Sequence, residues 1–305
     1  MPELPEVETL RLGLQKYLVG RRIENIEIRV PKIFVGNKND VIGAKIIGLK
    51  RIGKGLIIEL DNDFVLAVHL KMTGQLVYSD NETKNLPLSA KIGGVTLPSK
   101  YTHAIFKLKT QKSNVKTTGQ NLKLQNKPED AYLYYNDLRR FGWIKVVRKD
   151  EVDKIPFFRE MGPEPLLSSG QPVLTFEKFK EIIANSNLVV KVLLMDQRRI
   201  GGIGNIYANE ALFKAKIDPR RKVKTLSKEE LRKLYDAIYF VIKKGLEYGG
   251  SSDENFVNAL GQEGKYQNHF LIYGRKGEKC NGCGGIVKKI KLGGRGTYFC
   301  EKCQG

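Results

Sequence analysis

The amino-acid sequence predicts an α+β protein, with a strand-rich first half, a helical second half and a small cysteine-bearing unit at the carboxyl end. Three observations predict this class. Short β-branched and aromatic runs, separated by Gly, Asn and Asp, recur through residues 1–148. Apolar residues at helical spacing replace them after residue 170. All four cysteines lie in the last 26 of the 305 residues.

The first 148 residues are expected to form a β-sandwich or flattened barrel that follows one amino-terminal helix. Val7, Leu10 and Leu14 recur at helical spacing and predict a helix over Glu6–Leu18. Many short strands with turns between them favour a two-layer arrangement of this kind. The expected strands are Ile23–Val30, Ile42–Leu49, Leu56–Leu60, Phe64–Leu70, Tyr101–Leu108, Ala131–Tyr135 and Trp143–Val147.

A linker is expected over residues 149–170, because this stretch is rich in Asp, Glu, Lys and Pro and contains Gly-Pro-Glu-Pro. A helical domain over 171–271 and the cysteine-bearing unit over 272–305 follow it. The last long helix is marked by a capping box that Ser227 forms with Glu230. The helices are predicted at Phe176–Asn185, Val189–Met195, Asn205–Lys214 and Ser227–Tyr248.

The net charge of the chain is +20 and its isoelectric point is near 9.7. This surplus indicates a polyanionic partner, nucleic acid first and an anionic membrane surface second. A membrane is disfavoured because neither terminus has a basic amphipathic helix with a bulky apolar face, and no apolar run is long enough to span a bilayer. The amino terminus has no secretory signal, so a cytoplasmic protein is expected. Charge alone does not separate DNA from RNA.

The four cysteines are spaced as Cys280-x2-Cys283-x16-Cys300-x2-Cys303. Two such pairs are typical of a tetrahedral zinc site, and no cysteine is left over. Disulfides would need an oxidising compartment, of which the sequence gives no sign. We therefore expect one structural Zn²⁺ bound by these four thiolates. Zinc ribbons serve many proteins, so the metal does not specify the function.

The first residues after Met1 carry the strongest chemical signal. Proline is a small second residue, so removal of Met1 is expected, which leaves Pro2 as a free secondary amine followed by the carboxylate of Glu3. An α-amine titrates near ~7.7–8, against ~10.4 for lysine, and is therefore partly unprotonated at neutral pH. Addition of a secondary amine to an aldehyde-like carbon gives a cationic iminium, which acts as an electron sink, and Glu3 can exchange protons nearby. The alternative is a stiff, charged arm without chemistry.

Two further motifs suit contacts with nucleic acid. The glycine-rich turn over residues 201–204 leads into a helix at Asn205, and the exposed N–H groups of a helix start favour a phosphate. Asn205 is then a helix cap, a phosphate ligand or both. Arg139 and Phe141 stand between two strands, where an arginine fork and an aromatic ring can enter a base stack. The ordinary alternative for this pair is a solvated hairpin.

The opening MPELPEVET closely resembles the amino terminus of bacterial formamidopyrimidine-DNA glycosylases, bifunctional enzymes that excise oxidised purines. Met195-Asp196-Gln197, followed by the glycine-rich turn, resembles the helix–two-turn–helix signature of the same family. The resemblance spans the chain except residues 79–130, which look like an insertion. Within it, Lys107–Lys127 has six lysines and no acidic residue, and is interpreted as a solvated loop, with a basic contact to DNA as the alternative.

The resemblance implies a DNA glycosylase/AP lyase of base excision repair. In that family the residue matching Pro2 attacks C1′ of the everted nucleotide, and the residue matching Glu3 assists protonation at the sugar. The iminium then drives β- and δ-elimination, while the position of Glu6 supports the site. The catalytic set implied in this chain is Pro2, Glu3, Lys54 and Arg295, of which the last two contact phosphates.

The resemblance also implies a set of DNA-binding residues. Two of them contact phosphates in the family, one matches a basic family position, and three form a wedge that fills the gap left by the everted nucleotide. The phosphate contacts are His69 and Asn205, and the basic position is Lys191. The wedge is formed by Met72, Arg139 and Phe141.

Three departures from the family pattern stand beside these residues. Leu138 replaces a proline, Lys71 replaces a small residue, and Gly55 replaces an aromatic or other large residue. Lys71 adds a charge beside the wedge, and Gly55 bears on the local shape around Lys54.

The loop over residues 249–267 resembles the one that closes over the extruded base, and together with Leu4 it favours oxidised purines. We expect a monomer in the bacterial cytoplasm, associated with the nucleoid through its partner, which is duplex DNA with an oxidised base or an abasic site. One alternative is an endonuclease VIII-like glycosylase that acts on oxidised pyrimidines. The other is a non-catalytic zinc-ribbon protein that binds nucleic acid.

Overall fold

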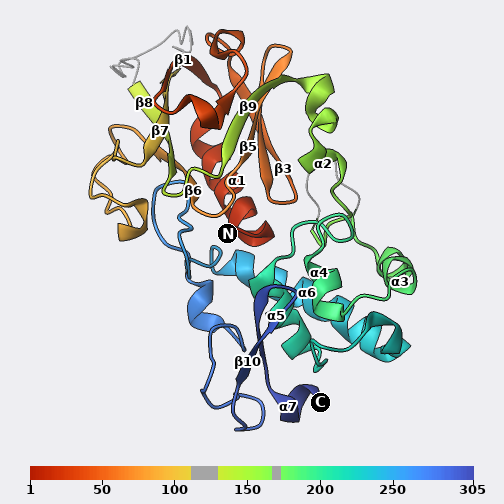
Figure 1. Ribbon diagram of the computed structural model, residues 1–305. Coiled ribbons are helices and arrows are strands. Elements are labelled where there is room, and N and C mark those ends of the chain that lie inside the picture. Colours follow the sequence, from red (N-terminus) through yellow and green to blue (C-terminus); the bar gives the residue numbers. More distant parts are fainter. Residues whose placement is uncertain (111–129, 167–172) are drawn as a thin grey trace, which may run out of the picture.

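The computed structural model describes residues 1–110, 130–166 and 173–305. The β-rich first half lies at the top of the view in Figure 1, the helical second half lies below it, and the amino terminus is placed between them. Most of the predicted lysine-rich stretch falls outside the described residues. Within these residues, no helix combines the length and the apolar character that crossing a membrane requires.

Two sheets and helix α1 (Leu4–Leu18) make up the first half. Neighbouring strands are antiparallel except for the parallel pair β2–β9. The first sheet has the order β1 (Arg21–Ile28), β7 (Thr102–Thr110), β8 (Asp130–Asp137) and β6 (Gly74–Ser79). The second has the order β2 (Phe34–Val35), β9 (Trp143–Arg148), β5 (Phe64–His69), β4 (Gly55–Leu60) and β3 (Ile46–Ile52). Short 3-10 turns lie at Pro31–Ile33, Lys38–Asp40 and Ala90–Ile92.

One apolar core is shared by the two sheets and α1, which confirms the predicted sandwich. Leu14 of α1, Leu66 of β5 and Leu133 of β8 all belong to it and are almost completely buried. Burial of such a side chain contributes ~1.5–3 kcal/mol. The alternation of apolar residues that predicts the strands therefore also builds the core that holds the sheets together.

The strands differ from the prediction most clearly in three places, which are the start of β3 and the two strands that the prediction lacks, the short β2 and β6. The strand expected from Ile42 begins at Ile46, because Gly43 adopts a left-handed backbone (φ 86°) that turns the chain first. Strand β6 is missing from the prediction, since it starts with a glycine and a glutamine. The side-chain NH₂ group of the buried Gln75 donates there to two backbone carbonyls, which only the folded chain supplies.

The four helices predicted in the second half are confirmed to within one residue at either end. The capping box of Ser227 and Glu230 is present at the start of the longest of them. These helices are α3 (Phe176–Ala184), α4 (Val190–Met195), α5 (Asn205–Lys214) and α6 (Lys228–Glu247). The remaining elements are 3-10 turns at Val223–Thr225 and Tyr266–His269, strands β10 (Lys288–Leu292) and β11 (Arg295–Phe299), and helix α7 (Glu301–Gln304).

Leu4 links the two halves of the molecule. Although it begins α1, its side chain is buried in the second core with Leu194 and Ile238. Its backbone N–H donates to the carbonyl of Gly202 at 3.0 Å. Gly202 has φ 86°, and a Cβ there would lie 2.6 Å from the Leu4 side chain, so both the backbone and the space require glycine. The start of α1 is thus fixed against the glycine-rich turn.

The segment that connects the halves is folded where it is described. It forms a 3-10 turn over Lys149–Lys154 and the short helix α2 (Pro156–Arg159). A Cβ added to Gly55 would lie 2.5 Å from the ring of Phe158 in this helix. The phenylalanine therefore fills the space that a larger residue in place of Gly55 would take, which explains this departure from the family pattern.

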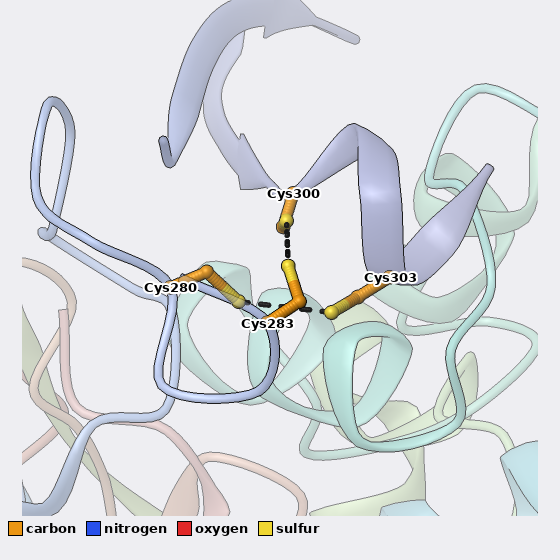
Figure 2. A group of neighbouring side chains, drawn as sticks. All are labelled: Cys280, Cys283, Cys300 and Cys303. Atoms are coloured by element: carbon orange, nitrogen blue, oxygen red, sulfur yellow. Dashed lines mark hydrogen bonds between the residues drawn. The ribbon is translucent and has the colours of Figure 1, made fainter. Parts of the chain in front are cut away.

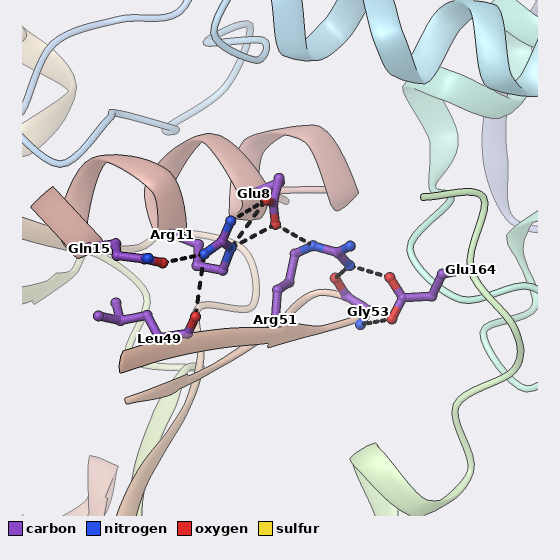
Figure 3. A network of polar contacts seen from close by, with 7 residues as sticks. All are labelled: Glu8, Arg11, Gln15, Leu49, Arg51, Gly53 and Glu164. Carbon is purple, nitrogen blue, oxygen red and sulfur yellow. Dashed lines mark hydrogen bonds and ion pairs between the residues drawn. The ribbon is translucent and has the colours of Figure 1, made fainter. Parts of the chain in front are cut away.

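A buried ion network fastens this segment to the first half (Figure 3). Arg51 and Glu164 are both fully buried and form an ion pair. Arg51 also donates to Glu8 of α1 at 3.0 Å, while Glu164 accepts the N–H of Gly53 at 2.6 Å. Because Gly53 precedes Lys54 in the β3–β4 turn, the network fixes this turn relative to both α1 and the second half.

Candidate active site

A pocket of about 190 Å³ lies at the junction of the two halves. Its lining comes from the start of the chain, the β3–β4 turn, the segment after β5, the start of α5, the loop after α6 and the β10–β11 hairpin. Six of the predicted site residues share this lining: Pro2, Glu3, Lys54, Met72, Asn205 and Arg295. The other four DNA-binding candidates, His69, Arg139, Phe141 and Lys191, are not part of it.

The carboxylate of Glu3 occupies the start of α5. It accepts the backbone N–H groups of Gly204 at 2.6 Å, Ile206 at 2.8 Å and Tyr207 at 3.4 Å. These are the N–H groups that the glycine-rich turn leaves exposed, and the positive end of the helix dipole favours an anion there. A Cβ on Gly204 would lie 2.4 Å from the Glu3 carboxyl carbon. The site expected to suit a phosphate is therefore filled by a carboxylate of the chain itself.

Asn205 is the first residue of α5 and does not cap it, because the capping position belongs to Gly204. The helix-cap interpretation is therefore wrong. The Asn205 side-chain oxygen instead accepts a hydrogen bond from Lys191 Nζ at 2.7 Å. Its place in the pocket lining leaves the phosphate-ligand interpretation in place.

Glu6 is buried directly behind Glu3. Its carboxylate accepts the Glu3 N–H at 2.8 Å, the Tyr207 hydroxyl at 2.8 Å and the Ser251 N–H at 2.8 Å. Burial, together with the charge of Glu3, raises the pKa of Glu6 to about 7. One carboxylate thus joins α1, α5 and the loop after α6, and it sits close to its titration point at neutral pH.

Two amines stand at the pocket. The amino group of Met1 forms an ion pair with Glu254, and removal of Met1 would expose the Pro2 nitrogen at this place. Lys54 is buried and donates from Nζ to the carbonyl of Ile203 at 3.0 Å. Burial lowers the pKa of Lys54, against the opposing effect of the nearby glutamates.

Lys191 is buried between α4, α5 and the β10–β11 hairpin. Its ammonium donates to Asn205 Oδ1 at 2.7 Å, to Thr297 Oγ1 at 2.7 Å and to the Gly296 carbonyl at 2.9 Å. Burial lowers the pKa of Lys191 to about 7, although Glu3 raises it. An ammonium has three donor hydrogens, and the chain itself accepts all three. In this structure Lys191 joins the hairpin to Asn205.

His69 lies at the end of β5 in an aromatic environment. Its ring stacks on Phe157 with centroids 4.0 Å apart and meets the edge of Trp143 at 5.7 Å. Burial, followed by the charges of Lys71 and Lys54, lowers the pKa of His69 to about 3. The ring is therefore neutral at physiological pH, and its Nδ1 has no hydrogen-bond partner within the described part of the chain.

Arg139 and Phe141 form an exposed pair in the turn after β8, which the Arg139 N–H joins to Thr73 Oγ1 at 3.0 Å. The Arg139 guanidinium lies 4.7 Å from the centroid of the Phe141 ring, and Phe141 is 52% exposed. The carboxylate of Asp137 holds their turn by accepting the N–H groups of Arg139 and Gly142 at 3.1 and 2.8 Å. A large aromatic ring in water is available for a partner, as the wedge interpretation requires.

Lys71, next to Met72 of the expected wedge, has a left-handed backbone with φ 54°. Residues with a Cβ avoid this region, so glycine would adopt the same backbone with less strain.

The four cysteine sulfurs form one cluster (Figure 2). All lie within 4.8 Å of one another, with Cys280 and Cys303 at 3.7 Å and Cys283 and Cys300 at 3.5 Å. Zinc–sulfur bonds of ~2.3 Å in a tetrahedron separate the sulfurs by about 3.8 Å. The donor set and its spacing fit one structural zinc ion. This ion would hold the hairpin that carries Arg295, whose turn uses the positive φ of Gly293 and Gly294.

Several lining residues escape sequence reasoning. Ser251 and Glu254 lie in the loop over 249–267 that the resemblance marks, but neither is singled out within it, and Tyr273 lies in an irregular segment whose local sequence gives no sign of a site. Gln197 carried a signal, because it belongs to the quoted Met-Asp-Gln motif. It shapes the glycine-rich turn by donating to the Ile203 carbonyl at 2.6 Å and accepting from the turn's backbone.

Known family profiles cover most of the chain. Residues 1–144 match the Formamidopyrimidine-DNA glycosylase N-terminal domain, and residues 161–256 match the Formamidopyrimidine-DNA glycosylase H2TH domain. Residues 277–305 match the zinc finger found in FPG and IleRS.

Similar proteins cover the chain from end to end. It is 37% identical to the formamidopyrimidine-DNA glycosylase of Pelotomaculum thermopropionicum and 32% identical to that of Streptococcus mutans, over 100% of this chain and 99% of each relative. Among solved structures it resembles Lactococcus lactis Fpg in complex with DNA containing an abasic site (34% identity, TM-score 0.80, 99% of both chains). It also resembles MutM (FPG) from Thermus thermophilus (34% identity, TM-score 0.80, 100% and 99% of the two chains). The chain therefore belongs to the formamidopyrimidine-DNA glycosylase family.

We predict one zinc ion per chain in the purified protein, measured by elemental analysis. Cys280→Ser should lose the metal and most of the affinity for duplex DNA, because the β10–β11 hairpin loses its support. A freshly purified parent protein without zinc, or full DNA affinity in the variant, would contradict this assignment.

His69 predicts a pH dependence of stability. Its folded-state pKa of about 3 lies below the ordinary 6.5, so the unfolded chain binds the proton more readily between these values. Above pH 6.5 His69 therefore costs the fold almost no stability. As the pH falls from 6.5 toward 3, its effect lowers the free energy of unfolding. Between pH 7 and pH 5 the loss from this residue amounts to about 2 kcal/mol.

Urea unfolding of His69→Gln at both pH values tests this point. The variant should lose about 2 kcal/mol less than the parent on acidification, whereas His269→Gln, at an exposed position, should behave like the parent. Equal losses in all three proteins would show that His69 is not held neutral in the fold.

Proposed function

We propose that the protein excises oxidised purines, such as 8-oxoguanine and formamidopyrimidines, from duplex DNA and then cleaves the abasic site in base excision repair. The observation that carries the proposal is the single pocket shared by Pro2, Glu3, Lys54, Asn205 and Arg295. Membership of the formamidopyrimidine-DNA glycosylase family supports it. We further propose that the protein is a monomer that acts on DNA in the bacterial cytoplasm. Its proposed domains are the β-sandwich over 1–148, the linker over 149–170, the helical domain over 171–271 and the zinc finger over 272–305.

The proposed nucleophile is the nitrogen of Pro2 after removal of Met1. The nucleotide first leaves the base stack. The Pro2 nitrogen forms a bond to C1′, while the bond from C1′ to the base breaks and the base leaves with the electron pair and takes up a proton. Loss of the N–H proton and opening of the sugar ring then give the iminium. It draws electrons from the C2′–H bond as the 3′ phosphate leaves and then from the C4′–H bond as the 5′ phosphate leaves, and hydrolysis frees Pro2.

Glu3 is proposed to manage the protons of this reaction. Its carboxylate is fixed beside Pro2 by the N–H groups at the start of α5. A carboxyl group held there can donate a proton to the ring oxygen as the sugar opens. Glu6, which accepts the Glu3 N–H and has a pKa of about 7, is proposed to support Glu3 in this position.

The remaining lining residues are proposed to hold the backbone of the kinked DNA. Lys54 and Arg295 supply positive charge, and Asn205 supplies an uncharged polar contact. Lys191 is proposed to act indirectly by positioning Asn205, and the neutral His69 can take part only through a hydrogen bond. Met72, Arg139 and Phe141 are proposed to fill the gap left in the duplex, which the exposure of Phe141 supports.

The rival functions make different predictions. A non-catalytic zinc-ribbon protein would account for the charge and the cysteines, but it gives no reason for an amino terminus fixed in a pocket. An endonuclease VIII-like enzyme would use the same amine on oxidised pyrimidines. Single-turnover cleavage of duplexes carrying 8-oxoguanine, an oxidised pyrimidine or a preformed abasic site separates the three. We expect the 8-oxoguanine and abasic duplexes to be cleaved, and a preference for the pyrimidine would contradict the proposal.

Glu3→Gln should slow excision of 8-oxoguanine much more than cleavage of a preformed abasic site. The preformed site already offers an aldehyde, whereas excision needs the proton that Glu3 supplies, and general acid catalysis is worth ~10²–10⁴-fold. Glu247→Gln, on the exposed side of α6, is the control, and a melting curve checks that both variants are folded. Equal losses in the two reactions would contradict the role given to Glu3.

DNA binding should depend on salt differently when a phosphate-binding residue is removed than when a wedge residue is removed. Arg295→Ala removes a cation at the phosphates, so it should weaken binding to all duplexes. The slope of log K for DNA binding against log salt concentration should become less steep by about one unit. Phe141→Ala removes no charge and should keep the parent slope while it slows excision. The two roles are wrong if Arg295→Ala keeps the parent slope or if Phe141→Ala excises 8-oxoguanine at the parent rate.

A further inference from the structure

One wall of the pocket is an irregular loop over residues 249–265, called the pocket loop below. Ser251, Glu254 and Phe256 of this loop line the pocket. The Ser251 N–H holds Glu6 at 2.8 Å, and Glu254 pairs with the amino terminus. The position of the pocket loop therefore decides the shape of the site around the reacting amine.

The pocket loop contains no helix or strand among its described residues, since α6 ends at 247 and the next 3-10 turn begins at 266. Its own hydrogen bonds are short-range, such as those from Ser252 Oγ to the Phe256 carbonyl and from Gly264 N to Ser252 Oγ. Gly249 and Gly250 both have positive φ at its start. A loop of this length and composition needs support from elsewhere in the chain to keep one position.

Strand β6 gives part of that support through the hydrogen bond that the Tyr78 N–H donates to the Ala259 carbonyl at 2.8 Å. The other part comes from residues 80–100, called the brace below, which lie in the stretch that looks like an insertion. Lys91 Nζ donates to the carbonyl of Ser252 and pairs with Glu263 at 2.9 Å. Ser89 Oγ donates to the other oxygen of the Glu263 carboxylate at 2.6 Å. The backbone N–H of Ser89 donates to the Gly261 carbonyl at 2.9 Å. Both ends of the pocket loop are thus bound to one short segment.

Apolar contacts complete the join between the brace and the pocket loop. Ile92 of the brace, Val257 of the pocket loop and Val77 of β6 form a separate small core and are almost completely buried. Gly261 has φ 76°, and a Cβ there would lie 2.7 Å from both Ile92 and Leu88. The two segments therefore approach as closely as their backbones allow, and the contact is a packed interface.

We propose that the brace holds the pocket loop in the position seen in this structure before DNA arrives, with Lys91 and Ser89 as positioning residues for base excision. The inference rests on the proposed function for its chemical consequence. The pocket loop is the wall against which an extruded base would lie, and an abasic site brings no base. Loss of the brace should therefore impair excision of a damaged base and spare cleavage at a preformed abasic site.

The test compares Lys91→Met with Lys84→Met. The first removes the ammonium that binds Ser252 and Glu263 and keeps the length of the side chain, while Lys84 is an exposed brace residue whose Nζ donates to Asn81 Oδ1 at 3.1 Å. Lys91→Arg restores the charge, and Glu263→Gln removes its partner. Hydrogen exchange of peptides covering 251–264 measures the order of the pocket loop in the full protein, and single-turnover assays on 8-oxoguanine and abasic duplexes measure the two reactions.

We expect faster exchange of the pocket loop in Lys91→Met and Glu263→Gln, with parent-like exchange in Lys84→Met and Lys91→Arg. Excision of 8-oxoguanine should fall about fivefold in Lys91→Met, as expected for one partly exposed ion pair with a further hydrogen bond. Abasic-site cleavage should stay at the parent rate. The double variant of Lys91 and Glu263 should be no worse than Lys91→Met, because the two residues act as one unit.

Unchanged exchange of the pocket loop in Lys91→Met would overturn the proposal, as would an equal fall in excision and abasic-site cleavage. A parent protein inactive on both duplexes would defeat the proposed function instead. In that case the exchange comparison would still decide whether the brace orders the pocket loop.

Discussion

The carboxylate of Glu3 at the start of α5 is the contact on which the rest of the site depends. It is buried, and a buried anion is tolerated only when it is fully hydrogen-bonded. Three backbone N–H groups and the positive end of the α5 dipole provide this compensation. Because Glu3 is also the capping residue of α1, one side chain fixes the first helix of one half against a helix of the other. The neighbouring Pro2 has little freedom left.

This constraint explains several residues at once. Gly204 must lack a side chain because the Glu3 carboxyl group fills the space, and Gly202 must lack one because Leu4 fills it. Glu6 closes the capping box of α1 and holds Ser251 of the pocket loop. The chain has a net charge of +20, yet the acidic side chains of Glu3 and Glu6 hold its two halves together at the pocket. Their charges keep Lys54 and Lys191 partly stabilised as cations even though burial lowers the pKa of both.

Sequence reasoning found the parts whose signal is local. The helices follow from apolar spacing, and the four cysteines from their own spacing. Pro2 and Glu3 follow from their chemistry and their resemblance to a family. Sequence reasoning also gave Asn205 as a possible helix cap, because only the folded chain shows that Glu3 accepts the N–H groups at this helix start. The resemblance implies that His69 contacts a phosphate, and this stays a prediction, but the sequence does not reveal the aromatic rings that bury its side chain. The pocket loop and its brace are joined by contacts between residues more than 160 positions apart, for which a single sequence carries no signal.

The central claim is that the fixed amino terminus supplies the reacting amine. Lys54 is the sharpest rival, because it lines the same pocket and its pKa is lowered by burial. Borohydride reduction during cleavage of 8-oxoguanine DNA converts the iminium into a stable amine, and peptide mass mapping then locates the sugar remnant. The account predicts a remnant on the nitrogen of Pro2, in protein that has lost Met1. A remnant on Lys54 or on any other lysine would contradict it.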